Sequence, residues 1–365
     1  MDKKVISIIG LGLIGGSIAK ALRYNPSNTN RESNNLFIKG FDKNEVSSEA
    51  LRDGTIDLKL NVIEDAKDSD IIFLCLPTEV SLQYFKILSE IINESCIITD
   101  VCGVKGAFED EWKKLNSKGT YIGGHPMTGK ETSGYASSDP LLFENSVYIV
   151  SDREKNTEKI EELVSLIKIL GARIRFLDPY IHDKVIARVS HLPQLLSIAL
   201  VNSVSENGGL NYLDFAAGGF RDMTRIASSS FDIWESVLKL NYKEIITAID
   251  GLNKNLLQIK DFLQTYDSSS LDALFKKARV KRDEIPKNTK GFINPLFDVF
   301  IYVKDEPGVL SKLTTLLYEN QINIKDMELL KIREGTGGTF RISFENAEVA
   351  VRAKSIIEKS GFATK

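Results

Sequence analysis

Four short segments place polar side chains within otherwise apolar sequence, and these side chains are the best suited to chemistry. The segments are TDVCGVKG (99–106), GGHPMTGKETSGY (123–135), HDKVIARVSHLPQ (182–194) and GGFRDMTRIASSSFDIWESV (218–237). The chain has only three histidines, and His125 lies in the most distinctive segment. An imidazole with an ordinary pKa of about 6.5 is suited to accept a proton near neutral pH. The alternative is a loop histidine that caps a strand end.

A glycine turn near the N-terminus predicts dinucleotide binding. Residues 10–15 (GLGLIG) match G-x-G-x-x-G, follow an apolar strand and open a helix. The first glycine permits the tight turn, the second lets the backbone approach a pyrophosphate, and the third permits close helix–strand packing. The expected cofactor-binding residues of this turn are Gly10, Gly12, Leu13, Ile14 and Gly15.

Asp42 ends the next apolar segment and predicts which dinucleotide is bound. A carboxylate there can accept hydrogen bonds from the adenosine ribose and repels a 2′-phosphate, which favours NAD over NADP. The polar insert 25–35 accounts for the long spacing between the glycine turn and Asp42.

Seven short apolar segments alternate with amphipathic ones up to residue 178, which predicts a doubly wound, Rossmann-type α/β domain (1–178) with a parallel sheet. The expected strands are 5–10, 36–42, 71–77, 96–101, 120–124, 146–151 and 172–178, and clear helical patterns cover 79–95 and 155–170. Ligands of such sheets bind at the carboxyl edge, where His125 is expected.

An all-α domain (179–290) is expected next, because no strand pattern occurs in it. Segment 181–204 is apolar on nearly every face, and Pro193 within it predicts a kink or break. One helix is expected over 232–264, opened by Asp232 and Glu235 at capping-box spacing. The apolar faces predict a homodimer. The polar, basic segment 276–291 is interpreted as a linker.

A small α+β domain of ferredoxin-like type (291–365) is expected at the end. Its elements are a strand at 297–303, a helix at 307–321 opened by Pro307, a hairpin at 322–344 and a helix at 346–361. Their order is βαββα, and a short last strand after it is left open.

Composition limits the classes of partner and compartment. Lys and Arg total 47 and Asp and Glu total 50, giving a net charge of −3, so neither nucleic acid nor an anionic membrane is expected as a partner. The three cysteines have no C-x-x-C spacing, and Cys75 and Cys96 are interpreted as core residues. No metal site is expected. Neither a signal peptide nor a bilayer-spanning segment is expected, so we predict a cytoplasmic protein.

Together with the glycine turn, the four polar segments resemble the prephenate dehydrogenase family over roughly the first three-quarters of the chain. The segment KDEPGVL (304–310) resembles an ACT domain. The resemblance implies oxidative decarboxylation of prephenate to 4-hydroxyphenylpyruvate with NAD as hydride acceptor, in tyrosine biosynthesis.

The resemblance also implies roles for single residues. His125 bonds the ring hydroxyl of prephenate and accepts its proton, and Arg225 binds a substrate carboxylate. Glu131 gates or orders the pocket, with a solvated loop carboxylate as the alternative. Other positions that match the family near the pocket are Asp183, Ser190, Gln194, Gly218 and Trp234.

Two departures from the family pattern leave other functions open. Gly103 stands where many members have a serine that supports the histidine, so water or Thr99 would take over. Gln194 stands where many have a second histidine on the substrate side. Arogenate, which carries an amino group in place of the side-chain keto group, is therefore the alternative substrate. A silent NAD and amino-acid sensor and a generic hydroxyacid dehydrogenase are further alternatives.

The ACT resemblance implies feedback by an amino acid. Tyrosine is the expected ligand and phenylalanine its rival, with Asp305, Gly308 and Asn323 as the expected contacts. Helix N–H groups after Gly308 can take a carboxylate. A domain that only strengthens dimerisation is the alternative.

Overall fold

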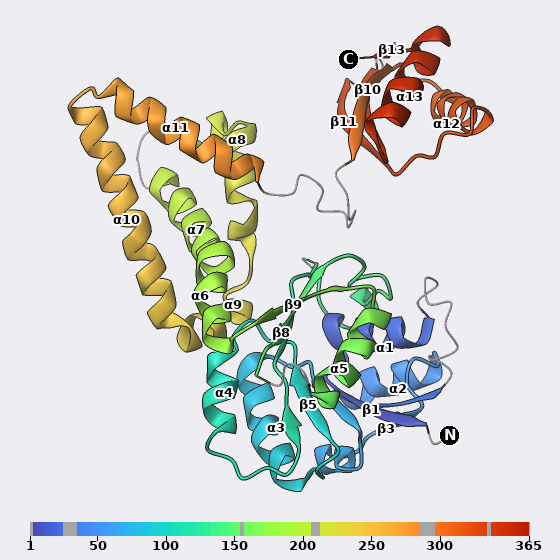
Figure 1. The fold of residues 1–365 in the computed structure, drawn as a ribbon, viewed down its shortest axis with the longest axis vertical. Helices are drawn as coiled ribbons and strands as arrows, with labels where there is room; N and C mark the ends of the chain where they lie inside the picture. The colour runs from blue at the N-terminus through green and yellow to red at the C-terminus, as the bar shows by residue number, and fades with distance from the viewer. Residues whose placement is uncertain are drawn as a thin grey trace. The chain divides into compact units, whose positions relative to one another are not determined.

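The computed structural model describes residues 3–24, 35–130, 132–153, 157–205, 212–284, 296–333 and 337–364. The chain divides into two compact units, Met1–Asp267 and Ser268–Lys365 (Figure 1). The domain boundaries at 178 and 290 remain predictions.

A six-stranded, all-parallel sheet forms the core of the first unit, in the order β3-β2-β1-β4-β5-β6. Its strands are β1 (Lys4–Ile9), β2 (Leu36–Phe41), β3 (Leu58–Lys59), β4 (Ile71–Leu74), β5 (Ile97–Asp100) and β6 (Thr120–Tyr121). The helices between them are α1 (Leu13–Tyr24), α2 (Asn44–Arg52), α3 (Thr78–Ile91) and α4 (Gly106–Trp112). Every residue of β4 and β5 is buried, as a sheet covered on both faces requires. The Rossmann-type prediction is confirmed.

The last predicted strands of this domain form a separate sheet, which corrects the expectation of one sheet. It contains β7 (Gly124–Pro126), β8 (Val147–Ser151) and β9 (Arg173–Leu177), with β7 antiparallel to β8. The predicted strand 120–124 divides between β6 and β7. β9 is partly exposed along its length, so it does not need the two-sided cover of a central parallel strand. Helix α5 (Glu158–Ile169) connects β8 to β9, with Thr157 as its N-cap.

A long helical run leaves the sheets and carries the predicted irregularity at Pro193. α6 (Pro179–Ile186) continues through a π-helical turn (Ala187–His191) into α7 (Leu192–Ser205). The Leu192 N–H bonds the carbonyl oxygen of Ala187, five residues back. Pro193 lacks an N–H and would crowd the carbonyl four residues before it, and the wider turn accommodates both effects without ending the helix.

The run Pro179–Val204 is long and apolar enough to cross a membrane by length and composition, contrary to the expectation from the sequence. Only 28% of its apolar 18-residue stretch is buried within the chain. It contains His182, Asp183 and His191, which are themselves buried.

The predicted helix 232–264 is two helices, α9 (Phe231–Leu240) and α10 (Tyr242–Gln264), separated at Asn241. The N-cap of α9 is Ser230, whose side chain accepts a hydrogen bond from the Asp232 N–H, so the assignment of Asp232 as the cap was wrong. The preceding helix is α8 (Gly218–Thr224).

The second unit begins with helix α11 (Ser268–Asp283), so the linker prediction is wrong for residues 276–283. Lys, Arg and Ala in this stretch have high helix propensity, which outweighs its polarity. The predicted boundary at 290 lies outside the described residues.

The small α+β fold is confirmed by β10 (Phe297–Val303), α12 (Val309–Glu319), β11 (Asp326–Arg333), β12 (Gly337–Phe344), α13 (Ala347–Lys359) and β13 (Ala363–Thr364). Its antiparallel sheet has the order β11-β12-β10-β13. α12 begins at Val309, after Gly308 in the left-handed conformation at φ 83°, and not at Pro307 as expected.

Candidate active site

The glycine turn between β1 and α1 leaves open space where a pyrophosphate would lie. A Cβ on Gly10, whose φ is +100°, would lie 2.7 Å from the Cys75 carbonyl oxygen, and one on Gly15 would lie 1.8 Å from that of Gly10. A Cβ on Gly12 would meet nothing within 4 Å. Two glycines are therefore required by the turn itself, while Gly12 keeps the space above it free. Leu13 and Ile14 open α1, where backbone N–H groups lack partners within the helix.

Asp42 lies directly beside this turn. Its Oδ2 accepts the Leu11 N–H at 2.6 Å and its Oδ1 accepts the Lys43 N–H at 2.6 Å. The carboxylate therefore holds the turn and remains at the end of β2, where a ribose would approach. The open cradle at Gly12 and this carboxylate together fit NAD.

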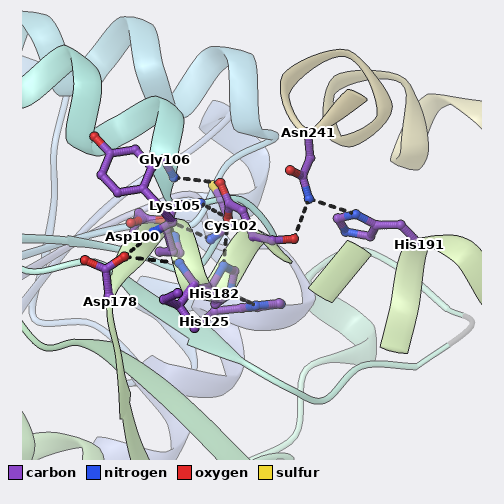
Figure 2. A network of polar contacts seen from close by, with 12 residues as sticks. Asp100, Cys102, Lys105, Gly106, His125, Asp178, His182, His191 and Asn241 are labelled. Carbon is purple, nitrogen blue, oxygen red and sulfur yellow. Dashed lines mark hydrogen bonds and ion pairs between the residues drawn. The ribbon is translucent and has the colours of Figure 1, made fainter. Parts of the chain in front are cut away.

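A chain of polar contacts runs behind His125, which lies on β7 (Figure 2). The His125 Nδ1 is 2.8 Å from the His182 Nε2, and the His182 Nδ1 is 2.8 Å from the Asp183 Oδ1. Asp183 also accepts the Lys105 N–H on Oδ1 and the Gly106 N–H on Oδ2, both at 2.8 Å. The histidine from the sheet domain is thus held by α6 and by the start of α4.

A buried ion pair supports the loop between β5 and α4. The Lys105 ammonium pairs with Asp100, and both side chains are almost fully buried. The Tyr121 hydroxyl donates to the Asp100 Oδ2 at 2.8 Å, and burial raises the pKa of this phenol well above its usual value. The ion pair fixes the Lys105 backbone, whose N–H reaches Asp183.

Asn241, at the break between α9 and α10, connects the third histidine to the same network (Figure 2). Its amide donates to the Asp183 carbonyl oxygen at 2.9 Å and lies 3.3 Å from the His191 Nδ1. The ring of His191 packs edge-on against Trp234, with centroids 5.9 Å apart. An amide NH2 can only donate, so the His191 Nδ1 accepts and its Nε2 carries the proton.

All three rings are kept neutral near pH 7. Burial, reinforced by His182, Lys105 and His191, lowers the pKa of His125 well below 6.5. Burial also lowers the pKa of His182, and that of His191 to about 4. A neutral imidazole at His125 is ready to accept a proton.

A pocket of about 460 Å³ opens at His125. Its lining comes from the β5–α4 loop, the segment after β7, the helical run around the π turn, and α9: Gly103, His125, Pro126, Met127, Thr128, Gly129, Ile186, Ser190, His191, Ile233, Trp234 and Val237. A Cβ on Gly103 would lie 3.9 Å from the His125 Nε2, so Gly103 leaves free space beside this nitrogen.

The structure brings Ser190 and Trp234 to the pocket with His125, but it places other expected substrate residues elsewhere. The Gln194 amide donates to the Ile226 carbonyl oxygen at 2.9 Å. Gly218 begins α8, and Arg225 begins the 3-10 turn 225–228 with an exposed side chain. None of these three lines the pocket. Glu131 lies outside the described residues.

The sequence interpretation missed the supporting groups His182, Lys105, Asp100 and Asn241. One signal was available for His182 and His191. A chain with three histidines, all within two of the polar segments, already indicated that they meet at one site.

In the second unit, Asp305 and Gly308 line a hollow of about 410 Å³ with Lys304, Phe340 and neighbouring residues. Asn323 lines a different hollow, with Tyr318 and Gln321. The three expected regulatory contacts therefore do not meet within one copy of the unit.

Three family models match the chain. They are the nucleotide-binding domain of prephenate dehydrogenase at residues 26–176, the prephenate dehydrogenase dimerization domain at 178–277 and the ACT domain at 297–361.

Individual proteins that are similar to this chain carry names that agree with these family matches. A prephenate dehydrogenase of Bacillus subtilis is 34% identical, over 98% of this chain and 96% of its own. A prephenate dehydrogenase of A. aeolicus, solved with hydroxyphenyl propionate and NAD+, is 29% identical with a TM-score of 0.69, over 78% of this chain and 99% of its own. Synechocystis arogenate dehydrogenase is 25% identical with a TM-score of 0.68, over 77% and 99%.

Proposed function

The chain belongs to the prephenate dehydrogenase family and is an NAD-dependent oxidoreductase, and from this premise we propose how its residues carry out the oxidative decarboxylation of prephenate. The observation that carries the proposal is the neutral His125 ring at the wall of the pocket, beside the free space at Gly103. Bound NAD supplies the hydride acceptor.

His125 acts on the ring hydroxyl of prephenate. As hydride leaves C4, the His125 Nε2 takes the hydroxyl proton, and C4 and its oxygen become a carbonyl. The bond to the ring carboxylate then breaks, CO2 leaves, and its electron pair makes the ring aromatic. The oxygen at C4 recovers a proton to give the phenol of 4-hydroxyphenylpyruvate. The part of the chain is to orient the substrate, so that the ring hydroxyl meets the His125 Nε2 and C4 would face the nicotinamide of bound NAD.

Arg225 pairs with a substrate carboxylate in this proposal, and Glu131, Ser190, Gln194 and Gly218 contribute to the substrate site. Because Arg225 does not line the pocket in the single chain, the turn 225–228 must approach when substrate or a second copy is present. A guanidinium matches a carboxylate with two parallel hydrogen bonds. Replacing Arg225 by Ala is expected to raise KM more than it lowers kcat, whereas a lysine there retains the charge and part of the affinity.

Prephenate is the proposed substrate, and arogenate is the second candidate because Gln194 replaces a family histidine. The deciding experiment measures NADH formation from each substrate under the same conditions. A higher kcat/KM with arogenate would reverse the assignment, and absence of NADH with both would leave the sensor alternative.

Tyrosine is the proposed regulatory ligand of the ACT domain. Asp305 and Gly308 line the hollow beside the start of α12, where backbone N–H groups can bind a carboxylate. Asn323 lies at a separate hollow, so it can contact the same ligand only if two copies of the domain pair. Coupling between the sites is typically about 1–3 kcal/mol.

The regulatory proposal is tested by comparing the full chain with a chain ending at Lys290, each assayed with and without millimolar tyrosine and, separately, phenylalanine. Inhibition of the full chain alone supports the sensor role. Equal inhibition of both means that tyrosine competes at the active site, and no response to either amino acid means that the domain is structural.

A cytoplasmic location is also proposed. The apolar run 179–204 contains active-site histidines and belongs to a matched dimerisation domain, which accounts for its hydropathy without a membrane. Fractionation of cells tests this, and recovery of the protein with membranes would contradict it.

A further inference from the structure

We propose that His182 is a positioning residue that fixes the tautomer of His125, and that the backbone N–H groups of Lys105 and Gly106 set this tautomer through Asp183. The inference rests on the proposed function and deepens it. It assigns a role to buried groups that the proton transfer itself does not use.

The argument starts at Asp183, because the roles of its partners are not ambiguous. Backbone N–H groups can only donate, and those of Lys105 and Gly106 lie 2.8 Å from the two carboxylate oxygens. Both oxygens are thereby committed as acceptors. The third contact, to the His182 Nδ1 at 2.8 Å, is then made by an N–H of the imidazole.

The next step follows from the neutrality of His182. Its side chain is fully buried, which lowers its pKa, although Asp183 opposes this effect. A neutral imidazole carries one N–H. Since the Nδ1 uses it toward Asp183, the Nε2 of His182 presents a lone pair to His125.

His125 must therefore donate from its own Nδ1 across the 2.8 Å contact. Its Nε2 is left without a proton and faces the free space at Gly103, at the pocket wall. This is the tautomer that a general base needs, and the opposite one could only donate to the substrate hydroxyl.

The same hydrogen bonds also suit the protonated form of His125. When the Nε2 of His125 takes a proton, its Nδ1–H remains bonded to the His182 Nε2. Neither ring therefore has to reorient or change its tautomer. Asp183, which bonds the His182 Nδ1, puts a carboxylate at the end of this series of contacts, while the Lys105 ammonium is paired with Asp100. Lys105 and Gly106, which donate to Asp183, belong to the segment 99–106, and His182 belongs to the segment 182–194. Two of the polar segments thus orient the histidine of a third, 123–135.

The direct test is nitrogen NMR of protein labelled with 15N-histidine. Only three imidazoles exist, and the His125→Asn variant assigns the signals of His125. We expect the Nδ1 of His125 to carry the proton and its Nε2 to be bare in the wild-type protein near pH 7.5. A protonated Nε2 on neutral His125 overturns the proposal.

The functional test uses His182→Phe, which keeps the ring volume and removes the acceptor, and His182→Gln, which keeps a carbonyl acceptor. For His182→Phe we expect kcat to fall roughly 10- to 100-fold, a part of the contribution of a general base, with KM for prephenate within about twofold and a mixed tautomer at His125. His182→Gln is expected to recover part of the rate and the tautomer. If His182→Phe does not fold, the tautomer and kcat of His182→Gln decide.

The outcomes separate this inference from the function on which it rests. Wild-type kcat in a folded His182→Phe variant, together with an inactive His125→Asn variant, rejects the tautomer proposal alone. Wild-type kcat in His125→Asn rejects the proposed function as well. A rate loss in His182→Phe with an unchanged, single His125 tautomer assigns His182 a packing role and also overturns the inference.

Discussion

At the scale of single residues, the site depends on one imidazole whose charge and direction are set by its neighbours. His125 is neutral because burial beside His182, Lys105 and His191 lowers its pKa. Its ring is oriented by one contact, to His182, which lies 57 positions away in the chain. The residue that bonds its ring, His182, comes from a different segment. Substitution of His125 should therefore remove the base itself, whereas substitution of its neighbours should change the charge or direction of the base.

Replacing His125 by Asn should lower kcat far more than it changes KM, because a base acts most strongly in the transition state. General base catalysis contributes about 10²–10⁴-fold, and a loss of this size is expected. Steady-state kinetics with prephenate provide the measurement. A kcat within a fewfold of wild type would remove His125 from the proton transfer.

The pH dependence of kcat/KM should reflect the lowered pKa of His125. The neutral form of His125 is the base, so activity is lost when the pH falls through the pKa of His125 in the folded protein. Because burial lowers this pKa well below 6.5, the acid limb should lie below pH 6.5. Initial rates between pH 5 and 8.5 test it, and a limb above pH 6.5 would contradict the lowered pKa.

The cofactor preference should depend on the charge of Asp42. Replacing Asp42 by Ser should relax the preference for NAD, because the repulsion of a 2′-phosphate disappears. It also removes the bond to the Leu11 N–H, so the matched variant is Asp42→Asn, which keeps an acceptor without the charge. The ratio of kcat/KM for the two cofactors is measured, and an unaltered ratio in both variants assigns the choice to another residue.

At the scale of elements, short connections position the site. The glycine turn joins β1 to α1, and the junction of the loop 101–105 with α4 brings the N–H groups of Lys105 and Gly106 to Asp183. The π turn allows α6 and α7 to continue past Pro193. Asn241 ends α9 with its side chain turned to the buried network.

Two glycines of one turn should respond differently to alanine. Gly12→Ala should leave the folded chain intact, since its Cβ meets nothing within 4 Å, but should weaken NAD binding by about tenfold or more because it fills the cofactor space. Gly15→Ala should destabilise the chain, since its Cβ would lie 1.8 Å from a backbone oxygen. Thermal melting and NAD titration of both variants check this; equal effects of the two variants on melting would contradict it.

At the scale of the whole molecule, the helical part of the first unit exposes many large apolar side chains. They include Val189, Phe215, Met223, Phe231, Ile233, Leu256, Leu257 and Leu263, each more than half exposed. This part matches a dimerisation domain. We propose that a second copy covers these side chains, because exposed apolar area of this extent favours association.

The dimer should weaken when a charge is placed on this surface. Leu257, 65% exposed on α10, is replaced by Glu, and Asn255→Glu adds the same charge on the other side of the helix. Sedimentation velocity should show dissociation of Leu257→Glu at concentrations where wild type and Asn255→Glu remain dimeric. A monomeric wild type would reject the homodimer.

Features that depend on neighbouring residues could be predicted from the amino-acid sequence. The glycine spacing, the apolar strands around Asp42, the motif at His125 and the βαββα order of the last unit all follow from steric limits and from periodicity within about ten residues. These predictions agree with the structure, apart from element ends such as Pro307. The basic helix α11 was mistaken for a linker because polarity was weighed above helix propensity.

Which distant segments meet could be seen only in the folded chain. It divided the predicted strands between two sheets, joined His125 to His182 and Asp183, and gave the amide of Gln194 to Ile226 rather than to the pocket. It also broke the helix 232–264 at Asn241, whose amide bonds Asp183. These contacts depend on the register and packing of elements that are far apart in the chain. A local sequence pattern does not show which distant group a side chain will contact.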